Sequence, residues 1–224
     1  MKKTIGLIIM LIIMLITLTG CAKVNYEVEI NKDGSGEIIY IYGISKEKLG
    51  GSTDLVEQFV GTMKEQAQES GYGVEIYEND EISGFKANKH LQNLSEEFSL
   101  EEAFGEEYVK DAENNKIIIE KSFWITKYSQ NAELDLTKLN DSNIEMTYKI
   151  KLPVDAKTNN ASSVSENGKE LTWILESGKI NKIEFVAEEA NIMSIMIVVG
   201  AVFAAVVVIA TIIIILKKKH VTKK

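Results

Sequence analysis

The sequence of 224 residues contains no arginine, a single cysteine, a single proline and two histidines. Without arginine, the chain lacks the planar side chain that proteins generally use to bind carboxylates and phosphates through two parallel hydrogen bonds. One cysteine cannot form an intramolecular disulfide. Two histidines and one cysteine are also too few for a Cys/His metal cluster, so no metal and no cofactor is expected.

Acidic residues are missing from both ends of the chain. All 33 of them lie between Ala22 and Asn191, together with 18 of the 25 basic residues, which gives this segment a net charge of −15. Such a segment repels nucleic acid and anionic lipid headgroups. We therefore expect no nucleic-acid partner, and any attachment to a membrane must be covalent or hydrophobic.

The first 20 residues have the pattern of a cleaved export signal. Lys2 and Lys3 precede an uncharged apolar stretch, Ile5–Leu18. As a helix, these 14 residues span about 21 Å, whereas the hydrocarbon core of a bilayer is about 30 Å thick. The stretch is therefore short for a permanent membrane span, and we expect residues 1–20 to be removed as a signal peptide.

The signal ends in Leu18-Thr19-Gly20-Cys21, which resembles the lipobox of bacterial lipoproteins. The resemblance implies a diacylglyceryl thioether on Cys21 and cleavage before it, with Leu18, Thr19 and Gly20 recognised by the signal peptidase. A thiol is required at the modified position, and the small residues before it let the peptidase approach the backbone. The alternative is an ordinary signal beside a solitary cysteine.

The opposite end carries a second apolar run, Ile192–Leu216, of 25 residues without a charge. At about 1.5 Å per residue, a helix of this length crosses a bilayer with some tilt. The lysine-rich residues 217–224 follow, and the positive-inside rule places such a cluster in the cytoplasm. The sequence predicts a single-pass, lipid-anchored protein of the bacterial cytoplasmic membrane, with residues 21–191 extracytoplasmic.

Small residues recur at a spacing of four within this predicted transmembrane helix, 192–216. Gly200 with Ala204, and Ala201 with Ala205, match the pattern that lets two membrane helices pack closely. The pattern permits a homodimer through the helix, although it also arises by chance in a helix rich in valine, isoleucine and alanine.

The middle segment opens with a predicted β-hairpin. Tyr26, Val28 and Ile30 alternate with polar residues, as in a half-buried strand, and residues 37–44 return after a Gly-rich turn at 32–36. This hairpin is the first element of the predicted sheet.

The same turn can be aligned with a calcium-binding loop of the EF-hand type. Asn31, Asp33, Ser35 and Gly36 occupy the matching positions, but Tyr42 stands where the bidentate glutamate is needed. The flanking residues also predict strands, whereas that motif requires helices. A hairpin turn is the preferred interpretation.

The segment Asp54–Ser70 predicts the main amphipathic helix. Asp54 with Glu57 matches a capping box, and Gly71 suits a helix C-terminus. Six apolar residues share one face at spacings of three and four: Leu55, Val56, Phe59, Val60, Met63 and Ala67. We expect this helix to pack on the sheet.

Further strands are predicted on both sides of an acidic stretch, residues 94–108, that contains a short helix around Phe98 and Phe104. They are 73–79 with 83–90 as a second hairpin, 116–127, 143–152, and, after a polar loop at 157–168, 171–175 with 183–185 as a closing hairpin. About eight strands and one or two helices in this order predict an α+β domain with a mostly antiparallel sheet.

The order of these features resembles the LppM-type bacterial lipoprotein domain. The shared features are a lipobox, an alternating strand, the NKDGSGE turn at 31–37, a helix, and a late Leu-Thr-Trp strand at 171–173 that leads to a membrane span. The resemblance covers Cys21 to about Asn191. It implies an extracytoplasmic domain associated with envelope lipids.

Catalytic motifs are missing from the sequence, which contains no G-x-S-x-G elbow, no phosphate-binding loop and no G-x-G-x-x-G. His90, beside Lys89 in a predicted strand, is interpreted as a surface residue. Adjacent glutamates such as Glu96 and Glu97 are interpreted as solvated, because acid–base chemistry requires burial that separates their pKa values. We expect no enzymatic activity.

Two predicted strands, around residues 38–42 and 117–125, carry apolar residues on both faces. A curled sheet of this kind could hold an acyl chain, and burial beneath loops explains the pattern equally well. The leading hypothesis is a membrane-anchored, non-catalytic domain that binds envelope lipid or lipoglycan at the outer leaflet. The alternative is a protein-interaction or regulatory module that positions another envelope protein.

Overall fold

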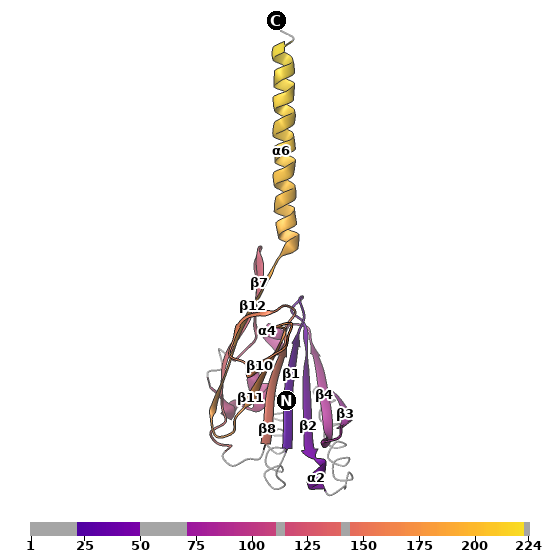
Figure 1. Ribbon diagram of the computed structural model, residues 1–224, viewed down its shortest axis with the longest axis vertical. Coiled ribbons are helices and arrows are strands. Elements are labelled where there is room, and N and C mark those ends of the chain that lie inside the picture. The colour runs from indigo at the N-terminus through magenta and orange to yellow at the C-terminus, as the bar shows by residue number, and fades with distance from the viewer. Residues whose placement is uncertain (1–21, 50–70, 111–114, 140–143, 222–224) are drawn as a thin grey trace. The chain divides into compact units, whose positions relative to one another are not determined.

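The computed structural model describes residues 22–49, 71–110, 115–139 and 144–221 (Figure 1). The predicted export signal, Cys21 with its lipobox, and the predicted helix Asp54–Ser70 lie outside the described residues. The chain falls into two compact units. One comprises the chain up to Ile119 together with Lys127–Glu188, and the other comprises Glu120–Thr126 together with the chain from Glu189 onward.

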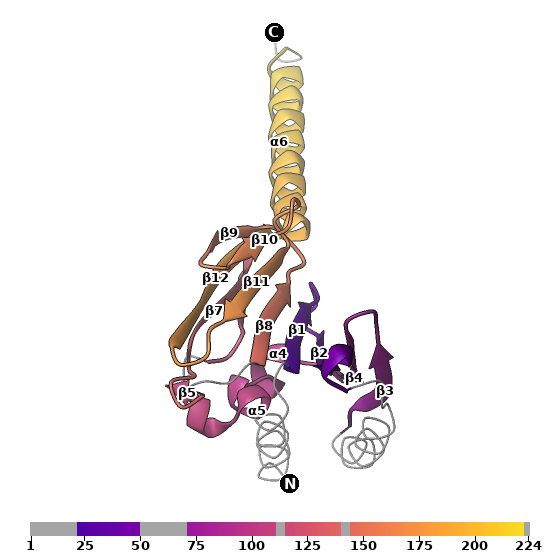
Figure 2. The same ribbon diagram turned by 60° about the horizontal axis from the view of Figure 1, so that its bottom comes forward.

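Two β-sheets form most of the first unit (Figure 2). The larger has seven strands in the order β10-β11-β8-β1-β2-β4-β3, and the smaller follows the order β5-β7-β12-β9, with β6 paired to β7. The larger sheet consists of β1 (Ala22–Ile30), β2 (Gly36–Ser45), β3 (Gly73–Glu78), β4 (Ile82–Leu91), β8 (Ile144–Lys151), β10 (Ser163–Val164) and β11 (Glu170–Leu175). The smaller consists of β5 (Val109–Lys110), β6 (Ile118–Lys121), β7 (Ile125–Asp135), β9 (Ala156–Asn159) and β12 (Ile180–Ala190).

The helices of the first unit are short. The described ones are α2 (Lys46–Leu49), α4 (Leu94–Glu97), α5 (Leu100–Phe104) and the 3-10 turn η1 (Glu106–Tyr108). The acidic stretch therefore folds as three successive turns. Ser99 separates α4 from α5, and its side chain accepts a hydrogen bond from the Glu101 N–H. Phe98 and Phe104 are both buried.

The first predicted hairpin is confirmed. β1 and β2 pair antiparallel from Ala22 opposite Ile44 to Ile30 opposite Gly36. In the turn, Gly34 has a φ of 93°, and the Asp33 carboxylate accepts hydrogen bonds from the Ser35 N–H at 3.0 Å and hydroxyl at 2.6 Å. These bonds close a hairpin turn between two strands. The second predicted hairpin, β3 with β4, is also confirmed.

The larger sheet is mixed, because β1 pairs in parallel with β8. The register runs from Ala22 opposite Ile144 to Glu29 opposite Lys151. This pair was not predicted. The predicted hairpins join neighbouring strands, whereas β1 and β8 are far apart in the sequence. The predicted α+β class with mostly antiparallel pairing is nevertheless confirmed.

Three local predictions were wrong. The predicted closing hairpin does not form, because β11 pairs with β8 and β10 in the larger sheet, whereas β12 belongs to the smaller sheet. The polar loop at 157–168 contains two short strands, β9 and β10. The single strand predicted at 116–127 is interrupted at 122–124, where the Ser122 N–H donates to the Ile125 carbonyl at 2.8 Å.

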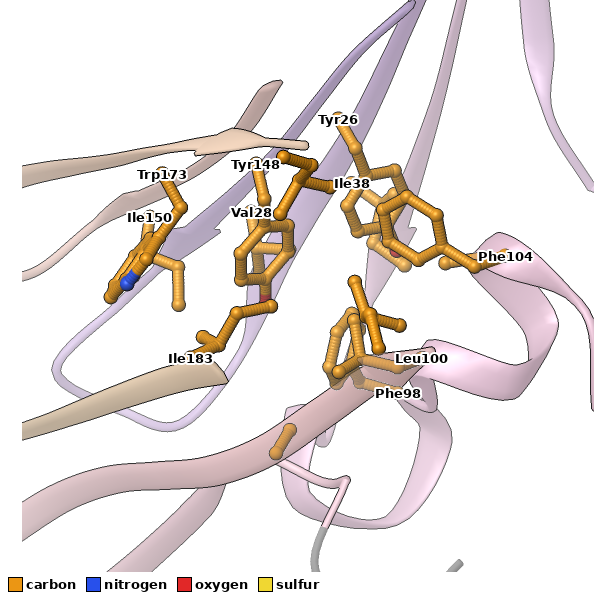
Figure 3. Close-up of a cluster of buried hydrophobic side chains, with 14 of the residues drawn as sticks. Tyr26, Val28, Ile38, Phe98, Leu100, Phe104, Tyr148, Ile150, Trp173 and Ile183 are labelled. Atoms are coloured by element: carbon orange, nitrogen blue, oxygen red, sulfur yellow. The ribbon is translucent and has the colours of Figure 1, made fainter. Parts of the chain in front are cut away.

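The core lies between the two sheets and the short helices (Figure 3). Tyr148 of β8 is fully buried and stacks on Tyr26 of β1, with ring centroids 5.6 Å apart. Trp173 lies on one side of this pair, and Phe104 of α5 lies on the other. Ile183 of β12 is also fully buried and faces Tyr148 from the smaller sheet (Figure 3).

Candidate functional site

The C-terminal helix α6 (Ile192–Val221) is the first candidate element. Its segment Ile192–Ile213 is long and apolar enough to cross a membrane, and only 6% of it is buried within the protein. A core helix of a soluble domain would be mostly buried. Among its described side chains, large apolar groups such as Phe203 are mostly exposed, in this case to 69%.

The small residues of α6 are open to contact. A Cβ added at Gly200 would meet nothing within 4 Å. Ala201, Ala204 and Ala205 are likewise exposed. Pairing of two copies through this face stays a prediction.

A hairpin tip belongs to the same unit as α6. We call residues Glu120–Thr126 the aromatic tip. The Ser122 hydroxyl donates to the Ile125 carbonyl at 2.8 Å and accepts from the Ile125 N–H at 3.1 Å. Phe123 and Trp124 therefore occupy the central positions of a tight turn, and their side chains are 50% and 53% exposed.

A surface hollow of about 340 Å³ lies at the carboxyl ends of β1 and β8. This volume is within the range of small-molecule sites, about 300–1,000 Å³. The sheet positions the lining, because the parallel pairing sets Glu29 opposite Lys151 and β11 brings Glu170 opposite the same lysine. The lining residues are Glu29, Ile30, Asn31, Lys32, Lys151, Leu152, Pro153, Asn167, Lys169 and Glu170.

The charge of the hollow differs from that of the domain. Three lysines and two glutamates line it, a local net charge of +1, whereas residues 22–191 carry −15. The Lys151 ammonium lies 2.5 Å from the Glu27 carboxylate, and this hydrogen bond raises the pKa of Lys151. Lys151 therefore stays charged at neutral pH, and Glu27 neutralises it, so the hollow together with this partner carries no net charge on an otherwise acidic surface.

The space between the sheets is occupied by protein side chains. The Tyr148 hydroxyl donates to Gln130 Oε1 at 3.0 Å, and Gln130 Nε2 donates to the Asn115 carbonyl at 3.3 Å. Burial raises the pKa values of Tyr26 and Tyr148 well above 10, so both phenols are neutral. Ile38, Tyr40 and Tyr42 of β2 share the face toward this space: Ile38 and Tyr42 are core residues, and Tyr40 packs against the core.

The second strand with apolar residues on both faces has a different explanation. Ile117 is fully buried, whereas Ile118, Phe123, Trp124 and Ile125 are each at least 40% exposed. The exposed residues belong to β6 and to the aromatic tip, so this segment exposes apolar side chains on the surface.

The other predicted site residues are spread over the chain. His90 of β4 is exposed, as expected, and Glu96 and Glu97 are not buried. Within the described ranges, no three His, Cys, Asp or Glu side chains gather as a metal site. Cys21 and its recognition residues, Leu18, Thr19 and Gly20, lie outside the described residues, so lipidation stays a prediction.

The described elements define an α+β domain followed by an apolar C-terminal helix. The chain belongs to the family described as "Protein of unknown function (DUF3153)", whose model matches residues 59–221. The comparison with curated proteins gives no match.

Among solved structures, the chain is similar to the NMR structure of the folded domain of the Mycobacterium tuberculosis LppM protein. The two share 15% sequence identity and a TM-score of 0.48 over 77% of this chain and 92% of that chain.

Proposed function

We propose that the chain is a bacterial envelope lipoprotein held in the cytoplasmic membrane at two points. Residues 1–20 are the export signal, Cys21 carries the acyl groups, α6 crosses the bilayer, and the lysine-rich end lies in the cytoplasm. The observation that supports this most directly is the exposure of the apolar surface of α6. Water is a poor solvent for such a surface, whereas the hydrocarbon core of a bilayer matches both its length and its polarity.

The two attachment points restrict the orientation of the domain. Ala22, next to Cys21 in the sequence, is buried and pairs with both Ile44 and Ile144. The chain leaves this unit after β12, where Ala187 pairs with Ala156, a few residues beyond the end of β8. The two exits therefore lie at opposite ends of β1, about 26 Å apart along the strand at about 3.3 Å per residue. Holding both at one bilayer surface lays the sheet along the membrane.

The domain is proposed to be non-catalytic and to bind the polar part of an envelope lipid or lipoglycan in the hollow. Its lysines, Asn31 and Asn167 offer donors and acceptors to phosphate and hydroxyl groups. A lining without net negative charge also suits an anionic headgroup better than the surrounding acidic surface does. The aromatic core between the sheets is an unsuitable place for an acyl chain, because side chains already pack there.

Anchoring is tested by metabolic labelling with a fatty-acid analogue and by alkaline washing of membranes. The wild-type chain should incorporate label and stay in the membrane pellet. A Cys21→Ala variant should lose the label but remain in the pellet through α6. A wild-type chain released by alkali, or a C-terminal tag digested by protease outside intact cells, contradicts the proposal.

Ligand binding is tested by native mass spectrometry of the full chain released from detergent micelles. We expect copurifying lipid or lipoglycan, and a Lys169→Glu variant that loses it. The matched control is Lys138→Glu, the same charge change at an exposed position outside the hollow. An equal fraction of lipid-bound chains in the two variants would show that the ligand binds outside this hollow. Absence of any lipid from the wild-type chain would favour the protein-interaction alternative. Crosslinking in cells that captures one dominant protein, and loses it when α6 is exchanged for another span, would support that alternative.

A further inference from the structure

The aromatic tip is anchored to the start of α6. The Asn191 N–H donates to the Trp124 carbonyl at 2.7 Å. Asn191 is the residue before α6, and it also accepts hydrogen bonds within the first helical turn, from the Ser194 N–H to its side chain and from the Ile195 N–H to its carbonyl. One residue therefore caps the helix and holds the turn of the hairpin, so the tip lies at the level where the apolar helix begins.

The tip exposes its two aromatic side chains, although both are apolar and large. The Phe123 and Trp124 rings are perpendicular, at 89°, with centroids 4.9 Å apart. Each is at least half exposed. Ile118 and Ile125, 42% and 40% exposed, extend the apolar surface along β6 and β7. Such a patch at a tight turn costs free energy in water unless something covers it.

The position of the tip indicates what covers it. Residues from Ile192 onward are exposed and apolar, so in the proposed topology the bilayer begins at this point of α6. Trp and other amphipathic aromatic side chains concentrate at the membrane–water interface, where the ring meets acyl chains and the indole N–H meets glycerol or phosphate oxygens. The net charge of −15 on residues 22–191 repels an anionic membrane surface as a whole, so a hydrophobic contact must supply the adhesion at the tip.

We propose that the aromatic tip is a second membrane-contacting element, which inserts Phe123 and Trp124 into the outer-leaflet interface beside the entry point of α6. This inference rests on the proposed function, because it requires α6 to span the membrane. The tip adds a second contact with the bilayer, which a single helix lacks. The occupant of the patch is the lipid interface itself.

The experiment uses the full chain reconstituted in phosphatidylcholine–phosphatidylglycerol vesicles. Some vesicles contain lipid brominated near the headgroup end of the acyl chains, and bromine quenches indole fluorescence on contact. The chain has two tryptophans, Trp124 and the core residue Trp173, which is 3% exposed. Quenching of Trp124 alone should remove about half of the emission, because one of the two indoles contacts lipid.

Two variants isolate the tip. Trp124→Phe retains only Trp173 and should lose nearly all of the bromine-dependent quenching. The exchange variant Phe123→Trp/Trp124→Phe keeps the composition of the tip, moves the indole by one residue, and should restore the quenching. Equal quenching of wild type and Trp124→Phe, or no quenching of wild type, overturns the inference.

The same samples separate this inference from the proposed function. A chain that resists alkaline extraction while Trp124 is unquenched spans the membrane without tip insertion, so only the inference fails. A chain that alkali releases has no span, and both then fail. If a protein partner covers the tip in cells, Trp124 stays unquenched in pure lipid vesicles, which also overturns the inference.

Discussion

Inserting a flexible linker between Cys21 and Ala22 should release the domain from the membrane surface. In the proposed topology, acyl chains hold one end of β1 at the bilayer and the chain leaving β12 holds the other. Ala22 cannot serve as a tether itself, because it is buried and paired in the sheet on both sides. The attachment at Cys21 therefore has no slack beyond a single peptide unit.

The required linker length follows from the strand. The exits are about 26 Å apart along β1, and a Gly/Ser linker of about 24 residues has a root-mean-square end-to-end distance of about 27 Å. This linker lets the sheet stand upright while Cys21 stays in the bilayer. A linker of about six residues reaches about 13 Å and should give an intermediate result.

Energy transfer from the domain to the membrane measures this change. A donor dye is attached at Lys138→Cys, an exposed position beyond β7. Leu136 N–H donates to the Lys179 carbonyl at 2.9 Å, so this loop lies beside the β11–β12 turn, at the Ala22 end of the sheet. Cys21 is thioether-linked in the proposed form and does not react. With acceptor lipid in the vesicles, transfer should be high without a linker and fall as the linker lengthens. Transfer that is equal for all three chains would refute the two-point attachment.

Four further predictions concern the fold. Above pH 10 the free energy of unfolding should fall by at least about 2.7 kcal/mol per pH unit, which is the share of Tyr26 and Tyr148 alone, because burial raises their pKa values and that of Tyr40 above those in the unfolded chain. Their stabilising effect is complete below pH 10 and is lost as pH rises, and urea titrations in detergent at several pH values measure it. Tyr148→Phe should cost about 1–3 kcal/mol, since Gln130 Oε1 loses its buried donor, and equal urea midpoints would contradict this. Gly84→Ala should destabilise the domain by at least about 1–3 kcal/mol, because the added Cβ would lie 1.8 Å from the Tyr42 carbonyl oxygen. Gly200→Ala, which meets nothing within 4 Å, should leave the same urea midpoint unchanged.

Local pairings could be predicted from the sequence because their signals lie within a few residues. The β1–β2 hairpin joins an alternating strand to a turn in which Gly34 takes a positive φ. The same reasoning found β3 with β4, and it located β8 by the alternation that ends before Pro153. The start of α6 at Ile192 could also be predicted directly, because an uncharged apolar run is recognised from its own residues alone.

The non-local parts could not be predicted. The residues of β11 and β12 do not indicate that the two strands enter different sheets. Apolar and polar residues alternate along both strands, and a turn at Gly178 joins them, as in a hairpin. At the aromatic tip, two short apolar runs, Ile117–Ile119 and Phe123–Ile125, were predicted as one strand, and this masked the turn between them. Ser122 was the one available signal, since its side chain closes the turn in the manner of an ST motif where glycine or proline would normally stand.

The parallel pairing of β1 with β8 determines both the hollow and the orientation of the domain. Because Glu29 lies opposite Lys151, residues that are far apart in sequence line one polar depression. The same pairing carries the chain from the end of β8 into β9 and β12 at the end opposite Ala22. An antiparallel partner in this place would put the residues after Lys151 beside Ala22, and both attachment points would then lie at one end of the domain. In the proposed topology, a sheet held at both ends of β1 instead has the hollow at the end from which the chain leaves this unit, close to a membrane-borne ligand.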